Sequence, residues 1–328
     1  MPEKQLINRG NVATSVGFGE GLLQAGEANP LIVALGADIT ASVKVSPFAE
    51  KFPRRFYSLG IAEQNCVGVA AGLALSGKIP VFATYSAFAS MRTLDQIRVS
   101  VCFNNLHIVI GGAHAGISVG PDGATHQALE DIAVMRVLPN MTVISPCDAT
   151  QTRLVTIAAL NELKGPVYIR YGREPMPDFT DETTPFETGK GQLLKDGTDV
   201  TIIATGHLVW EALEAAYALE KEDIHARVIN IHTIKPIDQD IIIQAAKETG
   251  AIVTAEEHQI CGGFGSAVAE VVAKNYAVPI EFIGMNDCFG ESGQPSELME
   301  KYGMTAIHIM LAVKKVLTSG NKVIEWNI

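Results

Sequence analysis

The sequence predicts an α/β protein of two domains, each a mainly parallel sheet flanked by helices. Short runs of β-branched residues alternate with longer helical segments from one end of the chain to the other, which is typical of parallel strands joined by crossover helices. Hydrophobic residues make up 47% of the 328 residues and charged residues 19%, so the chain has enough apolar material for buried parallel sheets. This length is also too great for one small core.

The predicted strands fall into two groups. Those of the first group are residues 31–35, 79–84, 107–111, 142–145 and 167–171, and those of the second are 200–204, 226–231, 251–255 and 279–283. Each is a short run in which β-branched or other apolar residues dominate. We expect helices between them.

The segment between the two groups breaks this alternation. It is rich in Pro, Asp, Glu and Thr, and Pro175, Pro177 and Pro185 disfavour regular structure there. We interpret it as an interdomain linker. The predicted domains are residues 1–175 and 191–328, with the linker at 176–190.

Charge and composition exclude several classes of protein. The net charge is -11 and no run of lysine or arginine forms a basic stripe, so a nucleic acid is not an expected partner. Residues 1–11 carry charges and no apolar core, unlike a signal peptide. The uncharged stretch at 99–121 contains asparagines, histidines and several glycines, unlike a membrane-spanning helix. We therefore expect a cytoplasmic protein without a membrane partner.

The cysteines and glycine-rich turns offer no metal or nucleotide site by their spacing. The cysteines are Cys66, Cys102, Cys147, Cys261 and Cys288. An odd, dispersed set is typical of reduced thiols that pack as small hydrophobic side chains. The glycine-rich segments 17–21 and 262–265 lack the full dinucleotide fingerprint, and the chain has no Walker A sequence. We expect no metal ligands and no phosphate cradle in this chain.

A single carboxylate, Glu63, opens an uncharged, alanine- and glycine-rich helical stretch at 66–77. Acidic residues are common in the first turn of a helix, where they meet the positive end of the macrodipole. A carboxyl group in apolar surroundings can also exchange a proton with a heterocyclic nitrogen near neutral pH. Taken alone, Glu63 leaves both explanations open.

Aromatic and thioether side chains follow the strand at 79–84. Tyr85, Phe88 and Met91 recur at intervals of three, which predicts that they share one helical face and can stack on a heteroaromatic ring. Most such stripes belong to a core. These residues lie at the carboxyl end of a predicted parallel strand, however, which is where open α/β sheets bind ligands.

A long glycine-containing loop follows the strand at 107–111. It carries His114, Asp122 and His126. Glycines let the backbone approach a ligand closely, and imidazoles can move protons near neutral pH. One such histidine is more often structural, but two histidines with an aspartate between them indicate a functional site.

These segments resemble the pyrimidine-binding domain of transketolases. The similar stretches are GIAEQN from Gly60, YSAF from Tyr85, DQIR from Asp95 and residues 114–140. Residues 254–270, TAEEHQICGGFGSAVAE, are similar to the C-terminal domain that follows it in that family. The resemblance spans essentially the whole chain but only the second portion of a full-length transketolase. The chain thus resembles the C-terminal subunit of a transketolase split into two polypeptides.

The resemblance implies a cofactor and a partner. The cofactor is thiamine diphosphate, with Mg2+ or Ca2+ bound through the partner subunit. The GDG motif and downstream Asn that hold the diphosphate through the metal ion in this family are missing here. The implied partner is an N-terminal, diphosphate-binding transketolase subunit, and the implied assembly is a heterotetramer of two subunits of each kind.

The resemblance also implies which residues bind the cofactor. Glu63 corresponds to the residue that hydrogen-bonds the aminopyrimidine nitrogen and promotes removal of the thiazolium proton. Phe88 corresponds to the residue that stacks on the pyrimidine, with Tyr85 and Met91 completing an apolar wall. Asp38 matches an aspartate near the cofactor.

A second set of residues corresponds to positions that bind the sugar. His114, Asp122 and His126 match residues that contact the ketose hydroxyls and anionic end or assist proton transfer, so both histidines are catalytic candidates with Glu63. Ser42 and Arg173 match residues that bind the terminal phosphate, a task suited to the planar arginine fork.

One departure from the family pattern concerns the substrate. Many transketolases carry a phosphate-binding arginine in a segment that reads ATR, where this chain has Ala13-Thr14-Ser15. Loss of a bidentate anion contact weakens phosphosugar binding by about 1 kcal/mol or more. We therefore hypothesise a non-standard ketose that is unphosphorylated, branched or carries another anion.

Three alternatives remain open at this stage. A 2-oxo acid dehydrogenase beta subunit also carries a GIAEQ-type motif, although the DGATHQ sequence from Asp122 favours a transketolase or a 1-deoxyxylulose-5-phosphate synthase. A non-catalytic subunit with the same fold is the third. In the second half of the chain no residue indicates catalysis, and His258, beside two glutamates, is expected to be an ion-paired surface group in a loop.

Overall fold

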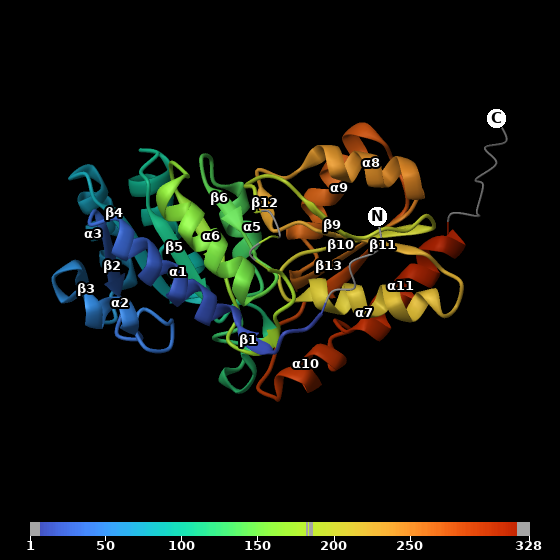
Figure 1. The fold of residues 1–328 in the computed structure, drawn as a ribbon, viewed down its shortest axis with the longest axis horizontal. Coiled ribbons are helices and arrows are strands. Elements are labelled where there is room, and N and C mark those ends of the chain that lie inside the picture. Colours follow the sequence, from blue (N-terminus) through green and yellow to red (C-terminus); the bar gives the residue numbers. More distant parts are fainter. Residues whose placement is uncertain (1–6, 182, 184–185, 320–328) are drawn as a thin grey trace.

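In a computed structural model, which describes residues 7–181, 183 and 186–319, the chain folds into two mainly parallel sheets flanked by helices (Figure 1). The predicted fold class is therefore confirmed. Residues 1–6 and 320–328 of the predicted domains, and Pro185 of the predicted linker, lie outside the described residues.

The first sheet has seven strands in the order β12-β6-β7-β5-β4-β2-β3. All neighbouring pairs are parallel except β12 with β6. Its strands are β2 (Ile32–Gly36), β3 (Phe56–Ser58), β4 (Ile79–Tyr85), β5 (Val109–Ala113), β6 (Thr142–Ile144), β7 (Val167–Arg170) and β12 (Thr233–Lys235). The α-helices around it are α1 (Thr14–Ala28), α2 (Ser46–Lys51), α3 (Glu63–Leu75), α4 (Leu94–Gln96), α5 (Asp131–Val137) and α6 (Ala149–Asn161).

The second sheet has five strands in the order β14-β13-β10-β11-β9, with only β9 antiparallel to its neighbour. Helices cover both of its faces (Figure 1), α8 and α9 on one and α7 and α11 on the other. The strands are β9 (Gln192–Lys195), β10 (Val200–Ala204), β11 (Ala226–Asn230), β13 (Ile252–Gln259) and β14 (Ile280–Met285). The helices are α7 (Leu208–Glu220), α8 (Gln239–Thr249), α9 (Phe264–Asn275), α10 (Pro295–Lys301) and α11 (Ala306–Ser319). None of the helices in the described part of the chain is both long and apolar enough to cross a membrane.

The start of the predicted linker is not irregular. Residues Pro175–Pro177 form strand β8, which pairs antiparallel with β1 (Asn11–Ala13) in a separate two-stranded sheet. Proline is tolerated here because the ribbon has only two strands and each strand is an edge. The prediction that the prolines prevent regular structure was wrong at this point. The domain boundaries at 175 and 190 themselves stay a prediction.

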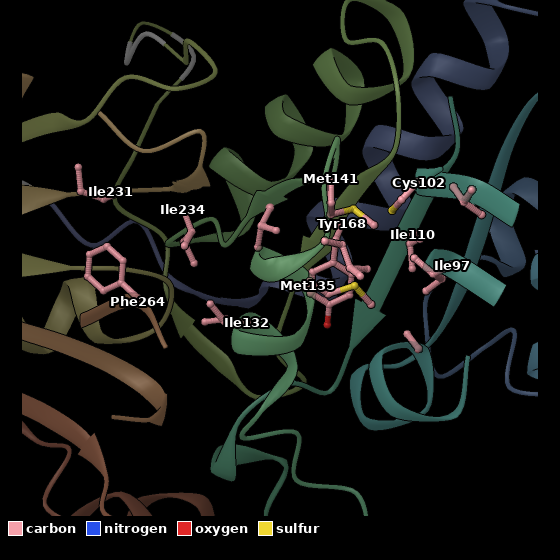
Figure 2. Packing of buried hydrophobic residues seen from close by; sticks show 14 of the residues in the cluster. Ile97, Cys102, Ile110, Ile132, Met135, Met141, Tyr168, Ile231, Ile234 and Phe264 are labelled. Atoms are coloured by element: carbon pink, nitrogen blue, oxygen red, sulfur yellow. The ribbon is translucent and has the colours of Figure 1, made fainter. Parts of the chain in front are cut away.

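The two halves of the chain share one hydrophobic core. Figure 2 shows Ile231 and Phe264 of the second half on one side and Ile110 of the first half on the other, with Ile132 and Ile234 between them. Strand β12 also leaves its own half and pairs with β6 through Thr233 and Ile144. The sequence did not predict that β12 joins the sheet of the first half, because a three-residue strand carries little periodicity.

Two further predictions from the sequence need correction. Cys261 and Cys288 are exposed, so only the other three cysteines pack as buried hydrophobic side chains. His258 lies inside strand β13 and is fully buried. Its Nδ1 bonds the carbonyl of Gln259 (2.7 Å) and its Nε2 accepts from the backbone N–H of Ala133 (3.3 Å). Burial lowers the pKa of His258 to about 4, so it is a neutral core residue and not a surface ion pair.

A buried ion pair of the first half, Asp131 with Arg170, also hydrogen-bonds the second half. Asp131 Oδ2 accepts from Arg170 Nε (2.9 Å), Tyr168 Oη (2.8 Å) and Ser86 Oγ (2.8 Å). Arg170 Nη2 then donates to the carbonyl of Glu257 in β13 (2.8 Å). Burial alone would raise the pKa of Asp131, but the charge of Arg170 outweighs it and the pKa is lowered.

We expect Asp131→Asn to destabilise the protein by about 3 to 5 kcal/mol, because it leaves the Arg170 charge buried without its counter-ion. The free energy of unfolding from urea titration measures this. Glu270→Gln is the matched control, since its partner pair with Arg136 (2.8 Å) is at the surface and is worth at most about 1 kcal/mol. Equal effects of the two substitutions would contradict the assigned role of the buried pair.

Candidate active site

The predicted site residues gather at the carboxyl edge of the first sheet. Tyr85 is the last residue of β4 and His114 follows β5 directly. Glu63 is the first residue of α3, the helix that leads into β4. Because parallel strands end at the same edge, residues far apart in the sequence meet here.

Glu63 is almost fully buried, with 3% of its surface exposed. Its Oε1 accepts a hydrogen bond from Arg92 Nη1 at 2.6 Å. The Arg92 guanidinium also lies over the ring of Phe88, 4.1 Å from the ring centroid. The Arg92 guanidinium therefore bridges two groups at the edge of the sheet. It is ion-paired with the Glu63 carboxylate and makes a cation–π contact with the Phe88 ring.

The segment after β4 is not the helix that the spacing of three predicts. Tyr85 still belongs to the strand, and Phe88–Arg92 forms a π-helical turn. A π turn has a wider repeat than an α-helix, so residues three apart no longer share one face. Met91 is 45% exposed as a result. The prediction of one shared helical face was wrong, and the turn brings Arg92 to Phe88 instead.

Aromatic rings connect Phe88 to His114. Tyr85 stacks on His114 with ring centroids 4.3 Å apart. His126 packs edge-on against both Tyr85 (5.8 Å) and Phe88 (5.3 Å). These four side chains, which we call the ring wall, line one continuous apolar surface that starts beside Glu63.

His114 carries two signs of a functional position. Its φ is 54°, a left-handed conformation that costs a non-glycine residue free energy. Its Nδ1 is buried without a hydrogen-bond partner among the described residues. Burial, followed by the charge of Arg173, lowers the pKa of His114 to about 4, so the ring is neutral at physiological pH.

The substrate candidates lie around this wall. Arg173 Nη1 and Asp122 Oδ1 form an ion pair at 3.2 Å, in which both side chains are partly exposed. The backbone of Ser42 lies beside the ring of His114, where it favours the charged form of the ring and opposes the lowering of its pKa. Among the described residues we find no hydrogen bond, ion pair or ring contact that joins Asp38 or Met91 to the others. Asp38 nevertheless has a φ of 65° and lies two residues after the end of β2, at the same sheet edge.

Comparisons with known proteins decide the family. The family model "Transketolase, pyrimidine binding domain" matches residues 10–177, and "Transketolase, C-terminal domain" matches residues 189–309. The chain belongs to the transketolase family.

Relatives cover nearly the whole chain. The 6-deoxy-6-sulfo-D-fructose transketolase subunit of Clostridium sp. (strain MSTE9) is 43% identical over 92% of this chain and 93% of its own. A putative transketolase C-terminal section of Methanocaldococcus jannaschii is 46% identical over 91% and 96%. A solved split-gene transketolase, an inactive β4 tetramer, is 48% identical with a TM-score of 0.87 over 95% of this chain and 100% of its own. A 1-deoxy-D-xylulose-5-phosphate synthase of Desulfotalea psychrophila is 38% identical, and the chain spans 49% of its length.

Arg92 is the residue of this transketolase-family site that the sequence reasoning did not identify. A signal was present, since Arg92 is the one charged residue between the strand at 79–84 and Asp95. Its contact with Glu63 was not predictable from spacing, because the two residues come from different elements and meet only through the π turn.

We expect the ring of His114 to stay neutral through the physiological pH range in this transketolase-family chain. Its burial disfavours the charged form, so its NMR signals should titrate with a pKa of about 4. Histidine-labelled protein, with the signal assigned through His114→Asn, gives the measurement. A histidine-containing peptide in the same buffer is the control. A midpoint at the peptide's value, about 6.5, would contradict the assigned environment.

Proposed function

We propose that this chain is the C-terminal subunit of a thiamine diphosphate-dependent transketolase, which transfers a two-carbon ketol unit from a ketose to an aldose. The observation that carries the proposal is the buried carboxylate of Glu63 beside the ring wall. A carboxylate that faces an apolar ring surface at this sheet edge suits a nitrogen heterocycle. Membership of the transketolase family supports the same cofactor.

The residues present fit the aminopyrimidine half of this cofactor. Between Glu63 and Phe88 the structure already holds a planar, nitrogen-bearing group, the guanidinium of Arg92. The unpartnered Nδ1 of His114 offers a further polar atom at the wall. Both observations support a site built for a planar ligand with hydrogen-bonding nitrogens.

Bound thiamine diphosphate supplies the carbanion chemistry at its thiazolium carbon. The residues of this chain would orient the cofactor and set the protonation of its aminopyrimidine ring. Glu63 hydrogen-bonds the ring nitrogen and holds the proton that this nitrogen exchanges. Phe88 and Tyr85 form the apolar wall and exclude water, with Met91 and Asp38 proposed at its margin. His114, neutral at physiological pH, and His126 are proposed to hold or move a proton at the substrate oxygens.

The sugar is proposed to lie between the ring wall and the ion pair of Asp122 and Arg173. Arg173 and Ser42 would bind its anionic end, and Asp122 a hydroxyl group. Ser15, at the position of the family's ATR arginine, is buried in the first turn of α1. The serine at this position supports a ketose substrate that carries an anion other than the usual terminal phosphate, or that carries no anionic group. The 43% identical relative is named for 6-deoxy-6-sulfo-D-fructose, a sulfonated sugar.

The proposed partner is an N-terminal transketolase subunit that holds the diphosphate through Mg2+ or Ca2+. Exposed apolar side chains lie close in sequence to Glu63 and Phe88, with Ile61 75% exposed and Met91 45% exposed. Such a surface suits coverage by another polypeptide. A relative that is an inactive β4 tetramer supports the need for a second kind of subunit. We propose a cytoplasmic heterotetramer in which the domains of this chain are 1–175 and 191–328.

We expect Glu63→Gln to reduce ketol transfer by at least about 100-fold, because an amide cannot take up the ring nitrogen's proton. The reconstituted pair of subunits is assayed with a ketose donor and an aldose acceptor. Asp240→Asn, which changes an exposed acidic residue in the first turn of α8, is the control for charge loss at a helix start. Turnover retained in the Glu63 variant would refute its role in cofactor activation.

We expect at least about a tenfold lower kcat/KM for xylulose 5-phosphate than for a ketose with a sulfonate or another unusual end, because the bidentate arginine contact is absent at Ser15. A panel of ketose donors with one common acceptor measures the ratio. An ordinary KM for xylulose 5-phosphate, with equal activity on the other ketoses, would remove this proposal. Formation of 1-deoxyxylulose 5-phosphate from pyruvate and glyceraldehyde 3-phosphate, with release of CO2, would favour the synthase alternative, which a 38% identical relative supports.

A further inference from the structure

Arg92 occupies the position that the proposed function gives to the aminopyrimidine ring. Its Nη1 donates to Glu63 Oε1 at 2.6 Å, and its guanidinium carbon lies 4.1 Å from the centroid of the Phe88 ring. The guanidinium is planar and presents N–H donors in its plane, as an aminopyrimidine does. One carboxylate oxygen and one ring face cannot serve both groups at the same time.

We infer that Arg92 is a displaceable occupant of the aminopyrimidine subsite. In the cofactor-free chain its guanidinium pairs with Glu63 and covers Phe88, and it leaves both residues when the cofactor binds. This inference rests on the proposed function, because it takes the ligand of Glu63 to be thiamine diphosphate. It implies that Arg92 lowers the affinity of the site for the cofactor, because its guanidinium must be displaced.

The buried carboxylate explains why an occupant is needed. Glu63 is 3% exposed, and Arg92 is the only side-chain or backbone donor to its carboxylate that we find among the described residues. A buried carboxylate without a donor is costly, since it loses its hydration and gains nothing in return. Arg92 therefore satisfies Glu63 until the cofactor supplies its own ring nitrogen.

The local structure allows the side chain to move while its backbone stays in place. The carbonyl of Arg92 accepts from Gln64 Nε2 at 3.0 Å, and the next residue, Thr93, donates its hydroxyl to the carbonyl of Ala89 at 2.6 Å. The side chain of Arg92 is 45% exposed, so a rotation about its side-chain torsions takes the guanidinium into solvent. The ion pair that it gives up joins a half-exposed guanidinium to a buried carboxylate, and the ring nitrogen of the incoming cofactor replaces the lost hydrogen bond to Glu63.

The experiment measures the dissociation constant of thiamine diphosphate by calorimetry, with saturating Mg2+, in the complex of this chain with its partner subunit. We expect Arg92→Gln to bind the cofactor about three- to tenfold more tightly than the wild type, because no ion pair or stacked cation has to be displaced. Arg98→Gln is the control. Arg98 is exposed in the following π-helical segment, Ile97–Cys102, so the variant reports the loss of one positive charge alone.

Two outcomes are distinguishable. Unchanged or weaker binding by Arg92→Gln, with Arg98→Gln at the wild-type value, overturns the inference and would mean that Arg92 holds the bound cofactor. No binding of thiamine diphosphate by the wild-type complex refutes the proposed function itself, whatever the variants do.

A second measurement does not depend on the glutamine variant. In Arg92→Ala, millimolar guanidinium chloride should refill the subsite and weaken thiamine diphosphate binding competitively, whereas the wild type should be insensitive at the same concentration. Equal sensitivity of both proteins overturns the inference. If the alanine variant does not fold, Arg92→Lys replaces it, with an affinity expected between those of the wild type and Arg92→Gln because lysine keeps the charge and loses the planar group.

Discussion

The buried pair of Asp131 and Arg170 is the interaction on which the site depends. Asp131 also accepts from Ser86, the residue between Tyr85 and the π turn, and Ser86 in turn bonds the hydroxyl of Tyr168. Gly112, next to the end of β5, has no side chain because a Cβ there would collide with the Tyr168 hydroxyl. The polar network below the sheet edge therefore fixes where β4 ends, and with it the direction from which Tyr85 and Phe88 form the ring wall.

Under the proposed function, the arrangement above this network is one half of a binding site. It offers a surface of aromatic rings and the buried carboxylate of Glu63, and the diphosphate-binding motif expected of the family is not in the sequence. Two polar groups bear on this, since the only donor to the Glu63 carboxylate in the described part of the chain is the half-exposed Arg92, and Nδ1 of His114 has no partner there. Buried polar groups in native proteins are normally satisfied. A ligand that brings planar donors and acceptors would complete both.

The sequence predicted what depends on local pattern. Strands such as β4 and β5 are mostly apolar runs, and their carboxyl ends placed Tyr85 and the loop after β5 correctly at one edge. It did not predict β12, because pairing of this three-residue strand with β6 depends on tertiary contacts. The π turn was missed because a spacing of three between aromatic and thioether residues does not distinguish an α-helix from a strand that ends in a wider π turn. Arg92 was missed for the same reason, since only the turn brings it to Glu63.

His258 shows the other limit of sequence reasoning. Three polar residues in a row, Glu256 to His258, are typical of a surface loop, yet all three are buried in β13. Each is compensated by a partner distant in sequence or in the next element. Glu256, for example, accepts from the first N–H groups of α9, at Phe264 (2.6 Å) and Gly265 (2.7 Å). Such compensation is a property of the folded chain and leaves no local sequence signal.

These glutamates also explain how a second domain without proposed catalytic residues serves the site. Glu257 Oε1 accepts from the N–H of Ser118, and its Oε2 lies 3.4 Å from His207 Nδ1. Burial alone would raise the pKa of Glu257, but the hydrogen bond and charge of His207 outweigh it, so the residue is an anion. From the other side Gln127 Nε2 donates to the carbonyl of Glu291.

The loop that carries His114, Asp122 and His126 is thus held at both ends by the second domain. A Cβ at Gly116 would collide with the Glu257 carboxylate, so this close approach requires a glycine, and its φ of 84° does so as well. His114, whose φ is strained, lies two residues before Gly116. Strain of this kind persists only where the surrounding structure over-determines it. The second domain supplies that constraint, and it contributes to the candidate site by fixing the position of the loop.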